Sequence, residues 1–272
     1  MTRCSIVSGV CGGGRVFRVV IPARYASTRL PGKALREIAG KPMLQWVYER
    51  ACAAGAAEVL IATDDEVVVS AARGFGAQAL LTARTHPCGT DRIAEVARGR
   101  AWAATDIVVN VQGDEPLIPC ALIRQVAGLL SAHPQADIGT LATPIDSLAE
   151  LMDPNAVKVV SDVRGRALYF SRAPIPWNRE GAATGLASQR DFSGARRHIG
   201  LYAYRVGSLL RLAQLPLGQL EAREKLEQLR ALEHGFNIQV AEAGERPGPD
   251  VNTPADLERV AALLEQDPAR RR

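Results

Sequence analysis

The stretch VVIPARYASTRLPGK, residues 19–33, decides the fold of this chain. Its β-branched first part predicts a buried strand, which runs into a loop carrying three cations, Arg24, Arg29 and Lys33. Cations this close repel one another unless an anion lies among them, and a polyphosphate has a suitable size and charge. Ligands of open α/β sheets bind beyond the carboxyl ends of the strands, so the loop predicts a phosphate site. The alternative is a solvated basic turn. The loop matches neither the dinucleotide-binding glycine motif nor a Walker A motif.

Strand and helix patterns alternate through the first half of the chain. β-branched runs predict strands at 17–22, 58–62, 77–81, 106–111 and 137–143. Helical patterns lie between them at 43–54, 65–74, 89–101 and 119–131. This alternation predicts an α/β fold with a Rossmann-like, mostly parallel sheet flanked by helices.

The alternation breaks after about Leu151. The segment VKVVSDVRGRALYFSRAPIPWN predicts two strands around a turn at 162–166 and then a proline-rich run, which together suggest an inserted arm over about 155–200. Residues 179–195 are rich in glycine, alanine and charge, so we expect a mobile loop. Later patterns predict a helix at about 220–234, a strand at 236–241 and a last helix capped by Thr253.

We expect a single domain over residues 16–264, with a flexible N-terminal extension at 1–15 and a basic tail at 265–272. The 272 residues are 47% hydrophobic, which is ample for one core. The net charge of +4 is mild and no long basic stripe occurs, so we expect no nucleic-acid partner. No apolar run is long enough to span a bilayer, so we expect no membrane partner.

The five cysteines include no C-x-x-C pair, which argues against a disulfide framework and a zinc site and fits a cytoplasmic location. The arm carries Tyr169, Phe170 and Trp177, more apolar surface than a lone domain exposes, which predicts a homodimer. An arm folded back on its own sheet is the alternative.

The run IVVNVQGDEPLIP, residues 107–119, places acidic groups where an apolar strand ends. Asp114 then lies at the same sheet edge as the cationic loop. Mg²⁺ is bound in proteins by one or two carboxylates together with substrate phosphates, so Asp114 is a candidate magnesium ligand. An Asx turn that merely closes the strand is the alternative.

Taken together, the motifs resemble the 3-deoxy-manno-octulosonate cytidylyltransferases, or CMP-KDO synthetases, over residues 17–262. The segments that carry the resemblance are PARYASTRLPGK, ATDD, CGTDRIAEV, NVQGDEP, PNAVKVV, YFSRAPIPW, RHIGLYAYR, LEQLR and NTPADLERV. The resemblance implies a fold of the nucleotide-diphospho-sugar transferase type with a dimerisation arm. It also implies transfer of CMP from CTP to the anomeric hydroxyl of 3-deoxy-D-manno-octulosonate (KDO), with release of pyrophosphate, for lipopolysaccharide biosynthesis.

The resemblance also implies roles for individual residues. The implied catalytic residues are Arg24, Arg29, Lys33 and Asp114. The implied nucleotide-binding residues are Ala23, Arg24, Lys33, Gly89, Thr90, Asp91, Arg92 and Gln112. The implied sugar-binding residues are Arg172, Arg197, His198, Tyr202, Glu227 and Gln228, although the last four are also explained as core residues and a solvated helix face. The implied Mg²⁺ ligands are Asp114 and Asn252, with Asp250 as an alternative to Asn252.

The chain departs from the family pattern at two positions. The family usually has aspartate where Asn252 stands, and an amide oxygen contributes no charge, so we expect a lower metal affinity. Cys88 replaces a usual serine and weakens a local hydrogen bond. Two alternatives therefore stay open, a cytidylyltransferase for another acidic sugar and a catalytically weakened CTP-binding relative.

Overall fold

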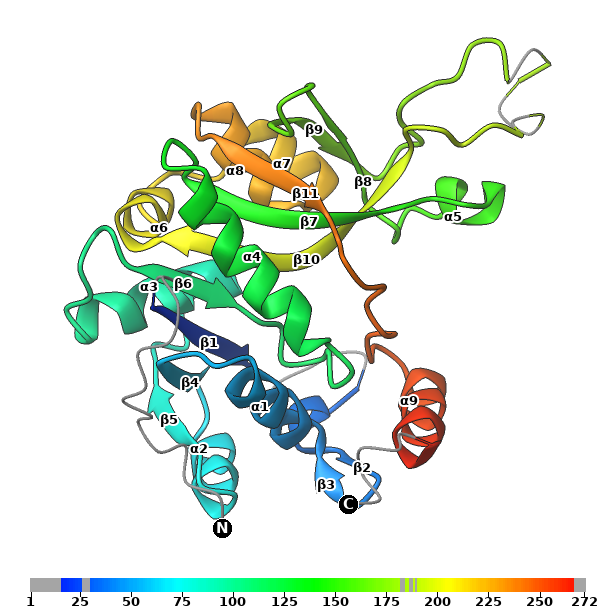
Figure 1. Cartoon of the computed structure of the whole chain (residues 1–272). Coiled ribbons are helices and arrows are strands. Elements are labelled where there is room, and N and C mark those ends of the chain that lie inside the picture. Colours follow the sequence, from blue (N-terminus) through cyan, green and yellow to red (C-terminus); the bar gives the residue numbers. More distant parts are fainter. Residues whose placement is uncertain (1–15, 26–29, 182–183, 186–187, 189, 267–272) are drawn as a thin grey trace.

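The computed structural model describes residues 16–25, 30–181, 184–185, 188 and 190–266. Over these residues a nine-stranded mixed sheet forms the centre of the molecule (Figure 1). Its main path runs β11-β7-β10-β6-β1-β4-β5. The strands are β1 (Phe17–Ala23), β4 (Glu58–Thr63), β5 (Gln78–Leu81), β6 (Ile107–Asn110), β7 (Ile138–Pro144), β8 (Lys158–Ser161), β9 (Ala167–Ser171), β10 (Arg196–Arg205) and β11 (Ile238–Glu242).

Successive side chains of β1 point to opposite faces of the sheet, and helices cover both faces. Val19 and Ile21 are fully buried in one apolar cluster, whereas Val20 is fully buried in a cluster on the opposite face. The first cluster contains side chains of α1 (Met43–Ala53), α2 (Glu66–Gly74) and α4 (Cys120–Ala132). The second contains side chains of α3 (Gly89–Gly99), α6 (Val206–Leu212) and α8 (Glu227–Glu233). The predicted α/β class is confirmed.

Strand β10 runs against its neighbours. It is antiparallel to both β6 and β7, while β1 pairs in parallel with β4 and β6, and β11 pairs in parallel with β7. The second half of the chain thereby inserts a returning strand into an otherwise parallel arrangement. This strand carries three of the predicted sugar-binding residues.

The expected helix at 220–234 is wrong in one respect, because two helices occupy this stretch. Helix α7 (Gln219–Glu224) ends at Lys225, whose φ of 54° is left-handed, and α8 starts two residues later. A buried ion pair joins the two helices, since Arg230 Nε and Nη2 donate to Glu221 Oε2 and Oε1 at 2.7 and 2.6 Å.

The arm begins with the predicted hairpin of β8 and β9, and the loop after it extends away from the body of the molecule (Figure 1). The expectation that Phe170 exposes apolar surface is wrong, because Phe170 is fully buried in the second cluster of its own chain. Trp177 is 52% exposed, as expected for the arm. The homodimer stays a prediction.

The C-terminal helix α9 (Pro254–Gln266) packs against the start of the chain through Val260 and Leu264. A small sheet of β2 (Glu37–Ile38) and β3 (Lys41–Pro42) lies in the same apolar cluster. Further described elements are α5 (Leu148–Met152) and a short 3₁₀ turn at Lys33–Leu35. Residues 1–15 and 267–272 lie outside the described part of the chain. No helix of the described residues is long and apolar enough to cross a membrane.

Candidate active site

Three separate segments meet at the carboxyl edge of the sheet. Lys33 comes from the loop after β1, Asp114 from the loop after β6, and Asn252 from the turn before α9. Lys33 Nζ donates to Asp114 Oδ2 at 2.7 Å and to Asn252 Oδ1 at 3.1 Å. The structure therefore brings together one predicted phosphate-binding cation and both predicted metal ligands.

Close backbone contacts fix the two loops that carry Lys33 and Asp114. The β1–β6 pairing continues past the strand end, because Val111 N donates to Val20 O at 3.2 Å. Gly113 then lies so near β1 that an added Cβ would meet the carbonyl oxygen of Pro22 at 3.0 Å. Only glycine allows this approach without a backbone shift, and the approach sets Asp114 beside the cationic loop.

The segment before α9 is fixed to the β6 loop. Val251 is fully buried, and its N–H donates to the carbonyl oxygen of Asp114 at 3.0 Å. The predicted capping arrangement follows, with Asp256 N donating to Thr253 Oγ1 at 3.2 Å and Thr253 N donating to Asp256 Oδ2 at 3.0 Å. Asn252 lies between these two anchors.

A cavity of about 470 Å³ opens beside the Lys33–Asp114–Asn252 cluster. The predicted residues that line it are Gly89, Thr90, Gln112, Asp114, Arg197, His198, Tyr202, Glu227, Gln228, Asp250 and Asn252. Predicted nucleotide, metal and sugar residues thus share one cavity although they come from distant parts of the chain. Its volume is in the range of small-molecule sites.

Strand β10 contributes His198 and Tyr202 to the wall of this cavity. The β7–β10 register shifts between Ile199 and Tyr202, and Thr140 Oγ1 contacts the carbonyl oxygens of Ile199 and Leu201 at 3.2 and 2.9 Å. His198 Nε2 lies 2.9 Å from the same Oγ1. Because the hydroxyl gives its one hydrogen to a carbonyl, we assign the histidine proton to Nε2.

Burial governs the protonation of these two side chains. It lowers the pKa of His198 to about 3 and raises the pKa of Tyr202 well above its usual value. The His198 ring also packs edge-on against Phe170, with 4.9 Å between the ring centroids. His198 is therefore neutral at pH 7 and held in one orientation, with Nδ1 as an acceptor.

Glu227 connects the nucleotide motif to the second half of the chain. Thr90 Oγ1 donates to Glu227 Oε2 at 2.7 Å, and Thr90 and Glu227 are 137 residues apart in sequence. Tyr204 lines the same cavity as Thr90 and Glu227. Burial, followed by the nearby charge of Glu227, raises the pKa of Tyr204. The contact therefore joins the start of α3 to the start of α8.

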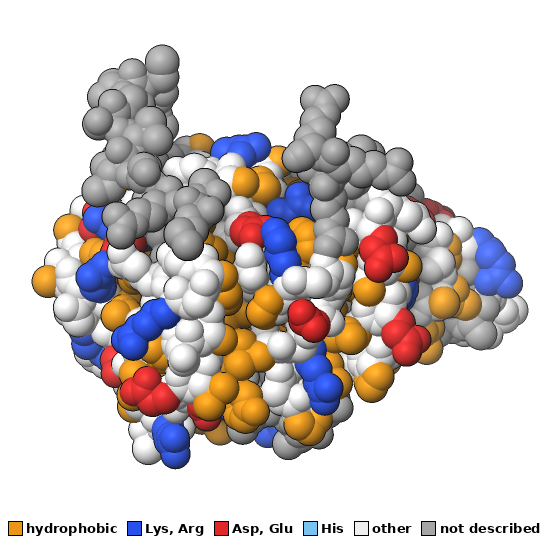
Figure 2. All heavy atoms as spheres, turned by 90° about the horizontal axis from the view of Figure 1, so that it is seen from below, with side chains coloured by type: hydrophobic (Ala, Val, Ile, Leu, Met, Phe, Trp, Pro, Cys, Tyr) orange, Lys and Arg blue, Asp and Glu red, His pale blue; other side chains and the backbone are white. Residues whose placement is uncertain are grey.

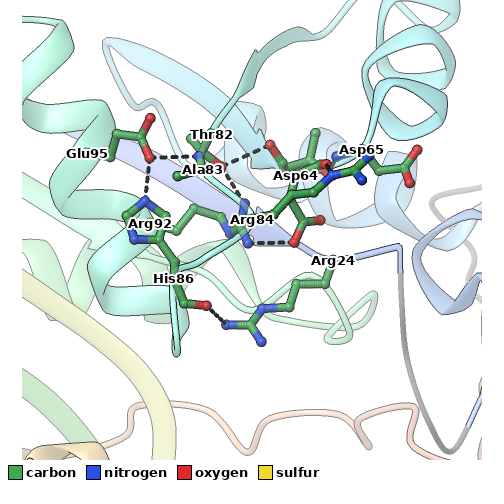
Figure 3. A network of polar contacts seen from close by, with 10 residues as sticks. Arg24, Asp64, Asp65, Thr82, Ala83, Arg84, His86, Arg92 and Glu95 are labelled. Carbon is green, nitrogen blue, oxygen red and sulfur yellow. Dashed lines mark hydrogen bonds and ion pairs between the residues drawn. The ribbon is translucent and has the colours of Figure 1, made fainter.

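Arg92 does not line the cavity. Its guanidinium is fully buried, donates from Nη2 to Asp64 Oδ2 at 2.8 Å, and contacts the hydroxyl of Thr82 (Figure 3). Arg24 lies in the same view and donates from Nη2 to the carbonyl oxygen of His86 at 2.8 Å. In this structure Arg92 holds protein loops together, and its predicted nucleotide contact stays a prediction.

The other predicted residues have different surroundings. Arg172 donates to the carbonyl oxygens of Glu224 and Pro154 at 2.6 and 2.8 Å, so it ties the arm to α7 and lies outside the cavity lining. Arg197 lines the cavity, with its Nε 3.3 Å from Glu150 Oε1. Asp91 is buried and accepts from Cys88 Sγ at 3.0 Å. Ala23 is buried at the end of β1, and Arg29 lies outside the described residues.

Glu115 is a cavity residue that the sequence analysis did not select. Burial, with the nearby charges of Asp114 and Asp250, raises its pKa to about 8. At neutral pH its carboxyl is largely protonated and is able to donate a hydrogen bond into the cavity. The motif contains Glu115 beside Asp114, but only the fold brings the distant charge of Asp250 into the same cavity.

The oxygens of Asp114 and Asn252 fit a divalent cation. The two oxygens come from different loops, and both contact the ammonium group of Lys33. Within the described part of the chain no group of three or more His, Cys, Asp or Glu side chains could hold a metal. A site with one carboxylate and one amide matches Mg²⁺, which takes its remaining ligands from phosphates and water.

Charges of both signs are mixed with apolar side chains on the face seen from below (Figure 2). Lys, Arg, Asp and Glu side chains are scattered over the described part of this face, and neither sign forms a continuous stripe among them.

Comparisons with known proteins agree with this geometry. A family profile described as "Cytidylyltransferase" matches residues 18–239. The 3-deoxy-manno-octulosonate cytidylyltransferase of Pseudomonas fluorescens is 56% identical over 249 residues, which cover 92% of this chain and 98% of that protein. The chain belongs to the 3-deoxy-manno-octulosonate cytidylyltransferase family.

Further members of this family and a solved structure are similar over almost the whole chain. The 3-deoxy-manno-octulosonate cytidylyltransferase of Thioalkalivibrio sulfidiphilus is 54% identical over 248 residues, covering 91% of this chain and 98% of that protein. A CMP:2-keto-3-deoxy-manno-octonic acid synthetase, solved in complex with CTP, superposes with a TM-score of 0.83 at 44% identity, covering 93% of this chain and 99% of that one. A cytidylyltransferase from Leptospira borgpetersenii, at 16% identity and a TM-score of 0.61, shares the fold.

Proposed function

We propose that this cytidylyltransferase transfers CMP from CTP to the anomeric hydroxyl of KDO and releases pyrophosphate. The supporting observation is the single cavity in which the Asp114–Asn252 pair adjoins the His198, Tyr202 and Glu227 wall. The product would serve lipopolysaccharide biosynthesis in the cytoplasm. A sugar hydroxyl bound against this wall would stand close to an α-phosphate held at the sheet edge.

In the proposed reaction the anomeric oxygen attacks the α-phosphorus of CTP. The bond from that phosphorus to its bridging oxygen breaks, pyrophosphate leaves, and the hydroxyl proton passes to solvent. Mg²⁺ bound by Asp114 and Asn252 would lower the pKa of the hydroxyl and neutralise phosphate charge. Lys33 exchanges its contact with Asp114 for the β and γ phosphates, where Arg24 and Arg29 join it and stabilise the leaving group.

His198 would serve the acceptor sugar. Its Nδ1 acceptor and the hydroxyl of Tyr202 provide hydrogen-bonding groups for sugar hydroxyls, because burial keeps the imidazole neutral. Gln228 and Glu227 supply two more hydrogen-bonding side chains from the start of α8. Arg197 is a cation of the cavity wall that suits the sugar carboxylate. Its guanidinium would leave Glu150 and bind the sugar carboxylate instead.

We also propose that the enzyme acts as a homodimer through its arm. Trp177 is 52% exposed and Leu168 62% exposed, and both belong to the arm. Light scattering at micromolar concentration would give twice the mass of the 272-residue chain. A monomer would overturn this proposal, and Trp177→Ser should shift a dimer toward monomer.

The test of the activity is pyrophosphate release from CTP and KDO as a function of Mg²⁺ concentration. We expect turnover that requires both KDO and Mg²⁺. A small panel of other acidic sugars serves as the control for acceptor identity. Activity on another acid with none on KDO would replace the proposed acceptor.

A catalytically weakened relative that only binds CTP is the second candidate, because Asn252 provides an uncharged ligand. It predicts CTP binding in calorimetry without pyrophosphate release at saturating Mg²⁺. Restored turnover in Asn252→Asp would then support it, and turnover by the native chain would exclude it.

A further inference from the structure

The carboxamide of Asn252 has a fixed orientation in this structure. Its Oδ1 accepts from Lys33 Nζ at 3.1 Å, and its Nδ2 donates to Asp250 Oδ2. The flipped amide would place Oδ1 against the Asp250 carboxylate and Nδ2 against the Lys33 ammonium. An acceptor would then face an acceptor at Asp250, and a donor would face a donor at Lys33. Only the observed orientation therefore satisfies both neighbours.

The backbone around Asn252 leaves little else to vary. Val251 N donates to Asp114 O at 3.0 Å, and Asn252 N donates to Asp256 Oδ2 at 3.1 Å. These contacts hold the main chain on both sides of the side chain. The remaining freedom of the side chain is rotation of the carboxamide about its own bonds. A rotation that exchanged Oδ1 and Nδ2 would turn an N–H donor toward a bound cation in place of the oxygen that could ligate it.

Lys33 cannot hold that orientation once a cation binds. Its ammonium contacts both Asp114 Oδ2 and Asn252 Oδ1, the two oxygens that would ligate Mg²⁺. In the proposed reaction Lys33 leaves these oxygens for the phosphates. Asp250 is then the partner that still directs Oδ1 toward the ion.

We propose that Asp250 is a positioning residue that holds the Asn252 carboxamide with its oxygen toward the metal, so that the pair replaces a single aspartate. This inference rests on the proposed metal site of the enzyme. Asp250 acts through Asn252 and is not itself a ligand. An aspartate at 252 has two equivalent oxygens and needs no such partner, so Asp250 should matter only while residue 252 is asparagine.

This conditional effect gives a double-mutant cycle. Mn²⁺ binding to the full-length protein with CTP and without sugar is followed by electron paramagnetic resonance, with a CTP-only titration as reference. In the native chain, Asp250→Ala, which removes the acceptor of the Asn252 Nδ2 hydrogen bond, should raise the Mn²⁺ dissociation constant about tenfold, as loss of an outer partner of a ligand typically does. In the Asn252→Asp chain, Asp250→Ala should change it less than about twofold.

Asp153→Ala is the matched control. Asp153 Oδ1 accepts from Asn155 Nδ2 at 3.1 Å, a second Asp-x-Asn contact that is separate from the Lys33 cluster. This variant should leave the Mn²⁺ dissociation constant within about twofold of the native value. Thermal melting of each variant checks that the fold is intact, and Asp250→Ser repeats the test with a different side chain.

Three outcomes overturn the inference. Equal weakening by Asp250→Ala in both backgrounds would make Asp250 a ligand or a general source of charge. No weakening in the native chain would show that Asn252 keeps its orientation without Asp250. An absence of Mn²⁺ binding in every variant would show that the proposed metal site does not exist. Pyrophosphate release is measured separately, so a chain that binds Mn²⁺ with CTP but does not turn over refutes the activity and not the role of Asp250.

Discussion

Two clusters of charge near the opening loop differ in what surrounds them. In the first, Lys33 and Asp114 have side chains 14% and 32% exposed and face the cavity. In the second, Arg92 is fully buried against Asp64, which is 18% exposed (Figure 3). The resemblance assigned cations of both clusters to the nucleotide. From this difference we expect the first cluster to serve ligands, whereas the second fixes the loops that carry the site.

Removing the carboxylate of Asp114 tests the first half of this comparison and should have the largest effect. Asp114→Asn should lower the rate of pyrophosphate release by about two to three orders of magnitude, since a group that stabilises the transition state is lost. The melting temperature should change little because the side chain is partly exposed. Asp146→Asn, which breaks a surface ion pair with Arg246, is the control and should keep the native rate. A rate within tenfold of the native value for Asp114→Asn would break the comparison.

Arg92→Met tests the second half. Removing the guanidinium leaves the Asp64 carboxylate without its partner, so the free energy of unfolding should fall by about 3 kcal/mol. Urea unfolding measures this change. Arg100→Met removes a half-exposed pair with Glu58 and should cost less than about 1 kcal/mol. Similar losses in the two variants would show that the burial of Arg92 is not what matters.

His198 sharpens the comparison, because it faces the cavity and is also shielded. The unfolded chain binds a proton at His198 near pH 6.5, while the folded chain does so only near pH 3. Stability should therefore fall as pH drops from about 6.5 toward 3, by at most about 1.4 kcal/mol per pH unit. His198→Gln should flatten this slope in urea unfolding at several pH values. An unchanged slope would mean that folding does not lower the pKa of His198.

Cys88 should give the smallest effect. Its Sγ donates to Asp91 Oδ2 at 3.0 Å, and a serine hydroxyl can donate in the same way. Cys88→Ser should keep kcat/KM within about twofold of the native value. Burial also raises the pKa of this thiol, so iodoacetamide at pH 8 should label it slowly. Rapid labelling would contradict the burial of this position.

The sheet and most helices followed from the sequence because their signals are local. The β-branched runs of β1, β4 and β6 set those strands to within one or two residues. The break between α7 and α8 was not predictable, because Lys225 is a non-glycine residue in a left-handed conformation and carries no turn signal. The antiparallel direction of β10 likewise depends on its neighbours and not on its own pattern.

The site was predictable as a set of segments and less so as a set of side chains. Thr90 and Arg92 belong to one motif, yet two positions along an α-helix differ by about 200° around its axis. Thr90 accordingly meets Glu227 at the cavity, and Arg92 points to the opposite side. The sequence contains the residues for both environments, but only packing decides which of them a ligand can reach.

The contact between Lys33 and Asn252 closes a loop of 219 residues. During synthesis the first strands and their helices emerge from the ribosome long before the segment that carries Asn252. The cytidylyltransferase core can thus begin to collapse while Lys33 and Asp114 still lack Asn252, and β10 must still enter between β6 and β7. Contacts this distant in sequence slow folding, so the newly made enzyme gains its activity late and all at once.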